Sequence, residues 1–230
     1  MRLAEVTMDD ISEEQQYIMQ KHEMGVNDET LAMFRALDAI KKDCQPYLQS
    51  VDYQPFTQYS LYRGITALST PLPLHILRDV RLDARKPKDS TVYLNDFIND
   101  YFETYYGEPF RQSVFVTSSQ SEASTYGALY LVFPAGDFTF LWSPEWEDLY
   151  NATGQHELKP DSPDPSHSRT LELKFIDNVL STYTTKDFKR AILSRHEIMI
   201  RSKSYHGISM NFQSVRTPSY TTGYQEYLTL

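Results

Sequence analysis

One stretch near the end of the chain constrains the fold most, because it reads as a strand that opens on a charged side chain. Its sequence is Arg195-His196-Glu197-Ile198-Met199-Ile200-Arg201. Successive side chains of a strand point to opposite faces, so we expect Ile198 and Ile200 on one face and Met199 on the other. Glu197 lies where a loop enters the strand, and this position can hold a carboxylate rigidly at the mouth of a cleft. The alternative is an ordinary exposed Glu at a strand end.

The composition predicts a folded protein with a sizeable core. Of the 230 residues, 40% are hydrophobic, which suits one large domain or one domain with an N-terminal extension. The formal net charge of −9 disfavours a surface that binds nucleic acid over its whole extent, but it is compatible with a local basic cleft. Cys44 is the only cysteine, so the chain forms neither an intrachain disulfide nor a cysteine-based zinc site.

Nothing in the sequence reads as a targeting or membrane-spanning segment. Residues 1–6 lack the apolar centre of a signal peptide. No apolar run is long enough to cross a bilayer. We therefore expect a cytoplasmic protein without a membrane partner.

The first 50 residues predict a helical segment. A short helix is expected over residues 9–24, and a longer one opens at Asn27 and ends or kinks at Pro46. These helices either pack on the following domain or bind a partner. From residue 59 onward, strand and helix patterns alternate. Strands are expected over residues 59–65, 113–118, 128–133, 138–142 and from 198, helices over 91–106, 120–126 and 171–193, and an edge strand over 217–230.

A local basic cluster between residues 78 and 88 has two interpretations. Its cations alternate with Asp79, Asp83 and Asp89. They form either a solvated, self-paired face or a loop that neutralises a pyrophosphate or another polyanion. No glycine loop of the Walker or dinucleotide-fold type occurs, so a nucleotide would be bound by another route. The cations are Arg78, Arg81, Arg85, Lys86 and Lys88.

A proline-rich stretch over residues 151–168 predicts an exposed loop or lid. It contains His156 and His167, but no cysteine or acidic arrangement accompanies them at metal-ligand spacing. We therefore expect no metal cofactor.

Three motifs follow one another at the ends of predicted strands. Arg63 precedes a glycine, Thr117 leads a run of hydroxyls, and Glu197 opens the late strand. This order resembles the arginine–serine–glutamate class of ADP-ribosyltransferases, over roughly residues 59–208. The matching residues are Tyr62-Arg63-Gly64, Phe115-Val116-Thr117-Ser118-Ser119, Ala123, Tyr126-Gly127, Glu197-Ile198-Met199-Ile200 and Tyr205.

The resemblance implies an α+β fold with a split, mostly antiparallel sheet, and transfer of ADP-ribose from NAD+ to a macromolecule. Residues 1–50 would then form an N-terminal helical segment and residues 51–230 the catalytic domain. Glu197 would stabilise the positive charge that develops on the ribose as nicotinamide leaves. Arg63 would contact the phosphate-bearing part of NAD+, and Thr117 would support Glu197. The other residues expected to bind NAD+ are Tyr62, Gly64, Ser118, Ser119, Tyr126 and Arg85.

Two departures from the family pattern bear on the acceptor and on the hydroxyl cluster. The family often has Ser first in the cluster, whereas this chain has Thr117 or a register shifted by one residue. Members that modify arginine usually carry Glu or Gln two residues before the catalytic Glu, and this chain has Arg195 there. A cation repels a guanidinium acceptor and suits an acidic or phosphate-bearing one, unless it simply faces solvent. We expect a protein acceptor in preference to nucleic acid.

Other interpretations of the same residues remain open at this point. Arg63 can pair with a carboxylate at the edge of the core, the run from Thr117 to Ser119 can cap the following helix, and Tyr126 can be core packing. At the level of function, the alternatives are an NAD+ glycohydrolase and a catalytically inactive binding module of the same fold. A small stand-alone domain of this kind also suggests a bacterial or phage effector that acts in the host cytoplasm.

Overall fold

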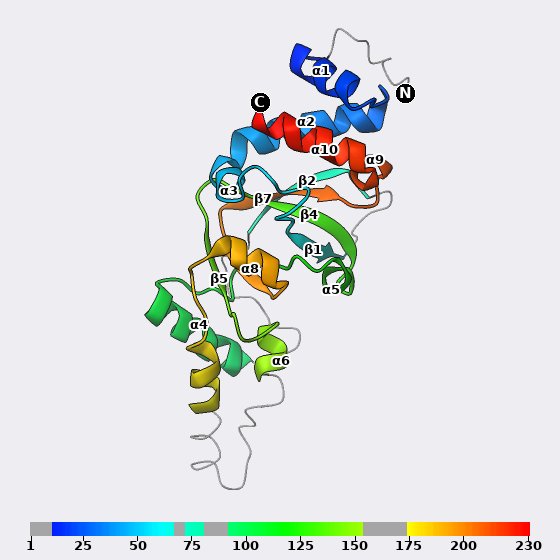
Figure 1. Ribbon diagram of the computed structural model, residues 1–230. Helices are drawn as coiled ribbons and strands as arrows, with labels where there is room; N and C mark the ends of the chain where they lie inside the picture. Colours follow the sequence, from blue (N-terminus) through cyan, green and yellow to red (C-terminus); the bar gives the residue numbers. More distant parts are fainter. Residues whose placement is uncertain (1–10, 67–71, 81–91, 154–173) are drawn as a thin grey trace.

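Two antiparallel sheets form the centre of the molecule. The computed structural model describes residues 11–66, 72–80, 92–153 and 174–230 (Figure 1). The larger sheet has the order β1-β4-β7-β2, and the smaller sheet has the order β3-β6-β5. The strands are β1 (Tyr62–Ile65), β2 (His75–Asp79), β3 (Val114–Val116), β4 (Ala128–Ala135), β5 (Thr139–Trp142), β6 (Ile198–Arg201) and β7 (Ser204–Ser209).

The N-terminal helices begin where the sequence supplies side-chain caps. The helices are α1 (Glu13–Lys21), α2 (Asp28–Asp43) and α3 (Gln45–Ser50). Ser12 caps α1 in a reciprocal capping box with Gln15, and the Asn27 side chain accepts from the Thr30 N–H at the start of α2. Pro46 lies in the first turn of α3, where its missing N–H costs no helical hydrogen bond.

The C-terminal tail, predicted as an edge strand, forms helix α10 (Pro218–Thr229) instead. Pro218 occupies the first turn, and Tyr224 and Tyr227 are buried. Both rings meet Phe34 of α2 edge-on, with centroid distances of 5.7 and 5.0 Å. The prediction from Tyr and Thr content was wrong because packing against α2 outweighs the weak strand preference of these residues.

The smaller sheet separates two hydrophobic cores, as the alternation in β6 predicts. Ile198 and Ile200 are buried in the larger core, which also contains α2, α3 and α10. Met199 faces the second core. That core also includes residues of α4 (Val92–Tyr106) and of a helical segment over residues 174–180. The predicted orientation of these three side chains is therefore confirmed.

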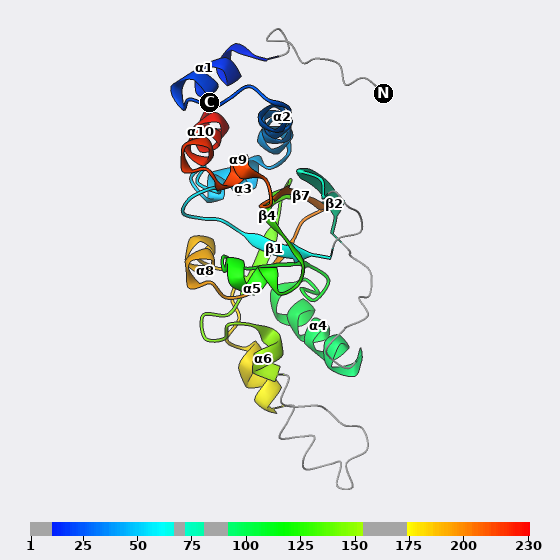
Figure 2. The same cartoon turned by 90° about the vertical axis from the view of Figure 1, so that its right-hand side faces the viewer.

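Two groups of helices lie at opposite ends of the molecule, and the strands lie between them together with α5 (Gln120–Ser124) and α8 (Phe188–Ser194) (Figure 2). α1, α2 and α10 lie at one end, and α4 and α6 (Leu149–Thr153) lie at the other (Figure 2). Residues 11–50 share the larger core with β4, β7 and α10, so the N-terminal helices pack on the sheet domain. A further helix is α9 (Gln213–Arg216).

Strand β2 was missed because its sequence was read as part of a basic cluster. Arg78 lies in this strand and pairs with Tyr205 of β7. The other cations of that cluster, Arg81, Arg85, Lys86 and Lys88, lie outside the described residues, as do His156 and His167. Within the part of the chain that the structure covers, no helix is long and apolar enough to cross a membrane.

Candidate functional site

The register of β3 and β6 brings the hydroxyl cluster next to the glutamate. Val116 pairs with Ile198 as the last residue pair of this antiparallel ladder. Thr117 follows Val116 and Glu197 precedes Ile198, so both residues lie just beyond the same end of the ladder. The Thr117 hydroxyl donates to the Arg195 carbonyl at 2.7 Å, which ties the two segments together.

Strand β1 brings the arginine to the same edge of the smaller sheet. Tyr62 and Thr117 exchange backbone hydrogen bonds of 2.7 and 3.0 Å, so β1 continues from the larger sheet onto β3. The next residue, Arg63, is half-buried, and its Nη1 donates to the Phe115 carbonyl at 3.1 Å. The Arg63 guanidinium therefore lies against β3. The neighbour of β3 in the smaller sheet is β6, which begins directly after Glu197.

The segment over residues 143–149, a loop that ends at the first residue of α6, holds the glutamate from the other side. The Glu197 N–H donates to the Glu147 carbonyl at 2.6 Å, and His196 Nδ1 donates to the Ser143 carbonyl at 2.8 Å. The Leu149 N–H reaches Glu197 Oε1 in a long hydrogen bond of 3.5 Å. These contacts fix both the backbone and the carboxylate of a half-buried residue at a strand entrance.

The three hydroxyls of the cluster have different roles. Thr117 holds the Arg195 carbonyl, and the Ser118 hydroxyl donates to the carbonyl of Ile192 in α8. Ser119 caps α5, because its Oγ accepts from the Glu122 N–H at 3.3 Å. The capping interpretation is therefore correct for Ser119. Thr117 and Ser118 instead support the segment that leads into Glu197.

The packing around β1 explains why position 64 is a glycine and position 62 a tyrosine. A Cβ on Gly64 would lie 2.1 Å from the Ala123 carbonyl oxygen, so only glycine lets β1 approach the end of α5. Tyr62 is buried, and its hydroxyl accepts from Gln120 Nε2 at 2.9 Å. Tyr126 is 65% exposed, so core packing is the wrong interpretation of its ring.

Arg111 is a residue of this region that the sequence analysis missed. It lies between α4 and β3, and its guanidinium carbon is 5.2 Å from the centroid of the Phe115 ring. Its backbone N–H donates to Asn99 Oδ1 at 2.9 Å, and its Nε donates to Asn95 Oδ1 at 3.3 Å. The available signal was a pair of asparagines four residues apart within the apolar stripe of a predicted helix, where a buried polar side chain needs a partner.

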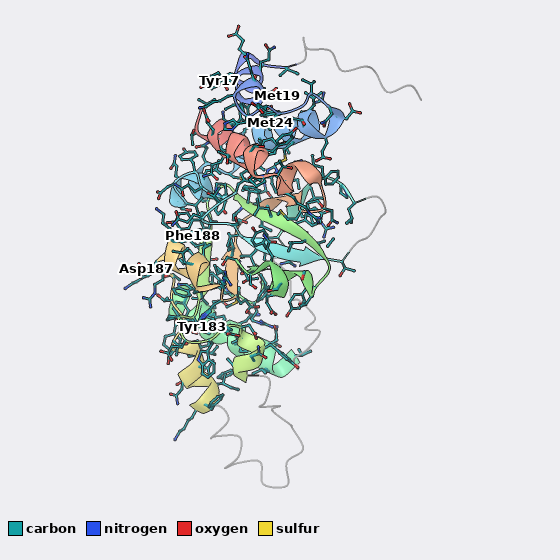
Figure 3. All side chains as sticks on the ribbon, turned by 45° about the vertical axis from the view of Figure 1, so that its right-hand side comes forward. Tyr17, Met19, Met24, Tyr183, Asp187 and Phe188 are labelled. Carbon is teal, nitrogen blue, oxygen red and sulfur yellow. The ribbon has the colours of Figure 1, made fainter. Side chains whose placement is uncertain are left out.

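Tyr183 connects Arg111 and Glu197 electrostatically. Burial raises the pKa of Tyr183 well above its ordinary value, the Glu197 charge adds to the increase, and Arg111 opposes it. Both charges therefore act on one buried phenol. Figure 3 shows Tyr183 on the side of α8 that faces α4 and α6.

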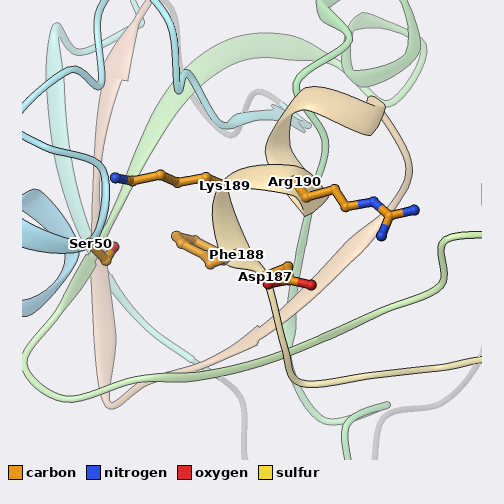
Figure 4. A pocket seen from close by; sticks show the side chains of 5 residues that line it. All are labelled: Ser50, Asp187, Phe188, Lys189 and Arg190. Atoms are coloured by element: carbon orange, nitrogen blue, oxygen red, sulfur yellow. The ribbon is translucent and has the colours of Figure 1, made fainter.

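A separate hollow lies against the first turn of α8. It has a volume of about 510 Å³ and is open to solvent. Lys189 and Arg190 point away from one another across it, beside Asp187 and Phe188 (Figure 4). Lys189 pairs with Asp52, and Arg63, Thr117 and Glu197 do not line this hollow.

The remaining expected residues fall on the surface or outside the described chain. Arg195 is exposed, and its φ of 67° is the left-handed conformation that ends α8. Arg85 lies outside the described residues. Among the residues that the structure describes, no group of three or more His, Cys, Asp or Glu side chains is placed to hold a metal ion.

Comparisons with known proteins add no further constraint. A scan against models of known protein families, a search of curated proteins and a search of solved structures each return no match. The interpretation of the site therefore depends on its geometry and on the order of its motifs.

Proposed function

We propose that this protein is a mono-ADP-ribosyltransferase that moves ADP-ribose from NAD+ to a macromolecular acceptor. The observation that carries the proposal is the convergence of three sequence-distant motifs on neighbouring strands. Thr117 and Glu197 lie just beyond the last pair of the β3–β6 ladder, and Arg63 of β1 binds the Phe115 carbonyl in β3. The two antiparallel sheets of the fold are compatible with the split sheet of the arginine–serine–glutamate class.

The chemistry assigns a different task to each residue. The bond between the nicotinamide nitrogen and ribose C1′ breaks, and nicotinamide leaves with the bonding electron pair. The positive charge left on the ribose resembles the oxocarbenium state of glycoside hydrolysis, and the Glu197 carboxylate stabilises it. Arg63 binds phosphate oxygens through its fork of donors. An anionic acceptor oxygen, from a carboxylate or a phosphate, then forms the new bond to C1′ with one of its lone pairs, so no proton has to be removed from it.

Thr117 acts through the backbone in this proposal. Its hydroxyl holds the Arg195 carbonyl, two residues before the carboxylate, at 2.7 Å. The loop over residues 143–149 holds the same segment at Ser143 and Glu147. Catalytic carboxylates need positions fixed to a fraction of an ångström, and these contacts supply that restraint.

The acceptor side is expected to be an acidic or phosphate-bearing group. The exposed Arg195 stands at the end of α8, two residues from Glu197. A guanidinium attracts such an acceptor and repels arginine. The net charge of −9 favours a protein target over nucleic acid, and the setting we propose is that of a bacterial or phage effector in the host cytoplasm.

Incubation with adenylate-labelled NAD+ and a bacterial lysate tests the proposal. We expect label on macromolecules that protease digestion removes and nuclease digestion leaves. Glu197→Gln keeps the shape and removes the charge, and we expect it to lower labelling by roughly a hundredfold or more. The control Glu103→Gln makes the same change at an exposed position of α4 and should label normally.

Other outcomes of this experiment identify the alternatives. Free ADP-ribose without labelled macromolecule would indicate an NAD+ glycohydrolase. Neither product, together with no calorimetric NAD+ binding, would indicate an inactive binding module. Label that only nuclease removes would transfer the acceptor assignment to nucleic acid.

A further inference from the structure

Two guanidinium groups from different elements meet at Phe115. Arg63 comes from β1 and donates to the carbonyl of this residue at 3.1 Å. Arg111 comes from the segment before β3, and its guanidinium carbon lies 5.2 Å from the centroid of the ring. Because β1 meets the outer edge of β3, Arg63 lies at that edge. Arg111 lies against the Phe115 ring. Phe115 thus contacts both cations, one through its carbonyl and the other through its ring.

Buried amides orient the second guanidinium. Asn95 and Asn99 are only 3% and 8% exposed, although both belong to an otherwise apolar helix face. Their side-chain oxygens accept from Nε and from the backbone N–H of Arg111, at 3.3 and 2.9 Å. Burying an amide side chain costs free energy unless it forms hydrogen bonds. An amide oxygen also fixes the plane of a guanidinium without adding a negative charge to it.

The position of the cations relative to Glu197 suits one particular ligand. Thr117 directly follows β3 and lies two residues after Phe115, which corresponds to about 6.6 Å in an extended chain. Glu197 lies beyond the same end of the β3–β6 ladder as Thr117, whose hydroxyl donates to the Arg195 carbonyl two residues before it. A ribose at Glu197 would therefore place a phosphate attached to its 5′ carbon near Phe115.

We propose that Arg63 and Arg111 together bind the pyrophosphate of a dinucleotide, with Phe115 as the platform between them. This inference rests on the proposed function and deepens it, because it adds Arg111 and its asparagine support to the site. The site then binds ligands that contain a diphosphate, such as NAD+, ADP-ribose and ADP, more tightly than a nucleoside without phosphate. Two forked donors match the several oxygens of a pyrophosphate better than one.

Titration calorimetry of the full chain at fixed ionic strength tests the pair. NAD+, ADP-ribose and adenosine serve as ligands for the wild type and for Arg63→Gln, Arg111→Gln and the double variant. Each single change should weaken ADP-ribose binding roughly tenfold or more, the usual effect of losing a hydrogen bond to a charged group. Adenosine affinity should not change. The control Arg35→Gln alters an exposed position of α2 and should leave all affinities as they are.

A second variant separates phosphate binding from folding. Asn95→Asp keeps the side-chain shape but places a carboxylate 3.3 Å from Arg111 Nε, where it competes with the phosphate for the cation. We expect a loss of ADP-ribose affinity with an unchanged circular-dichroism spectrum. This variant also gives a result if Arg111→Gln does not fold.

The outcomes distinguish this inference from the proposed function. Wild-type affinity for ADP-ribose in both Arg111→Gln and Asn95→Asp would overturn the role of Arg111 and leave the proposed function intact. An equal loss for ADP-ribose and adenosine would assign Arg111 a structural role and overturn the inference in the same way. If the wild type binds neither NAD+ nor ADP-ribose, the proposed function fails and the inference fails with it.

Discussion

Gly64 is the residue where β1 and the end of α5 approach backbone to backbone. A Cβ there would lie 2.1 Å from the Ala123 carbonyl oxygen and 2.9 Å from the Gly127 nitrogen. Gly127 is itself held against the Ile65 carbonyl, with a φ of 135°, so neither backbone can move away independently. The residue beside the candidate arginine is therefore fixed by packing, whatever ligand the site binds.

Gly64→Ala should lower the free energy of unfolding by about 2 kcal/mol or more, because overpacking forces backbone shifts. Urea denaturation measures this change. Gly25→Ala is a matched control, since the nearest atom to its added Cβ would be the Tyr220 hydroxyl at 3.7 Å. Equal effects of the two substitutions would contradict the tight approach of β1 and α5.

Thr117 and Ser119 should respond differently to loss of their hydroxyls. Thr117→Val removes the hydrogen bond to the Arg195 carbonyl, so we expect the rate of NAD+ cleavage to fall roughly tenfold. Ser119→Ala removes an N-terminal cap and should cost about 1 kcal/mol of stability, with a smaller effect on rate. The rate of NAD+ cleavage and the melting temperature of each variant distinguish these two effects. The reverse pattern would remove Thr117 from the site.

At the scale of elements, the sequence predicted the helices and strands whose apolar spacing is visible within the element itself. The apolar spacing of α4 was readable because one face of the helix is buried in a single core. The alternation of β6 was readable because its two faces are buried in two different cores. The placement of Arg63 on β1 and of Glu197 before β6, with β3 between these two strands, was expected only from the order of the motifs. Arg111 was missed because its significance comes from Asn95 and Asn99, which become its partners only when α4 packs beside β3.

Helix α10 is an element whose local sequence pattern predicted the wrong secondary structure. Its Tyr and Thr residues favour strands, yet it packs as a helix against α2 through Tyr224 and Tyr227. Tyr224→Ala should lower the free energy of unfolding by roughly 3 to 5 kcal/mol, as for other buried aromatic residues. Denaturant titration measures the loss. An effect below about 1 kcal/mol would mean that α10 contributes little to the larger core.

At the scale of the molecule, a chain of hydrogen bonds links an edge of the larger sheet to the helical end. His206 Nε2 donates to the Asp43 carboxylate of α2 at 3.1 Å, which leaves Nδ1 to accept from His75 Nε2 at 2.8 Å. Burial lowers the pKa of both histidines. The neighbouring histidine lowers the pKa of His75 further, while Asp43 opposes the decrease at His206.

These lowered pKa values make stability depend on pH in a defined direction. The unfolded chain takes up protons on these histidines near pH 6.5, whereas the folded chain does so only at lower pH. The unfolded state therefore binds more protons as pH falls below 6.5, and the free energy of unfolding decreases. Denaturation at pH 7.5 and pH 5.5 should show this loss, and His75→Gln should reduce it. If the stability of His75→Gln depends on pH as much as that of the wild type, the proposed role of the two histidines is contradicted.

The whole account depends on Arg63, Thr117 and Glu197 forming one site that cleaves NAD+. Release of nicotinamide from NAD+ by the purified protein tests this most directly, because transfer and hydrolysis both produce it. We predict release by the wild type, a loss of roughly a hundredfold or more in Glu197→Gln, and wild-type release in Glu103→Gln. Release of nicotinamide by Glu197→Gln at the wild-type rate would contradict the account. Absence of nicotinamide release by the wild type in the presence of a bacterial lysate would contradict it too.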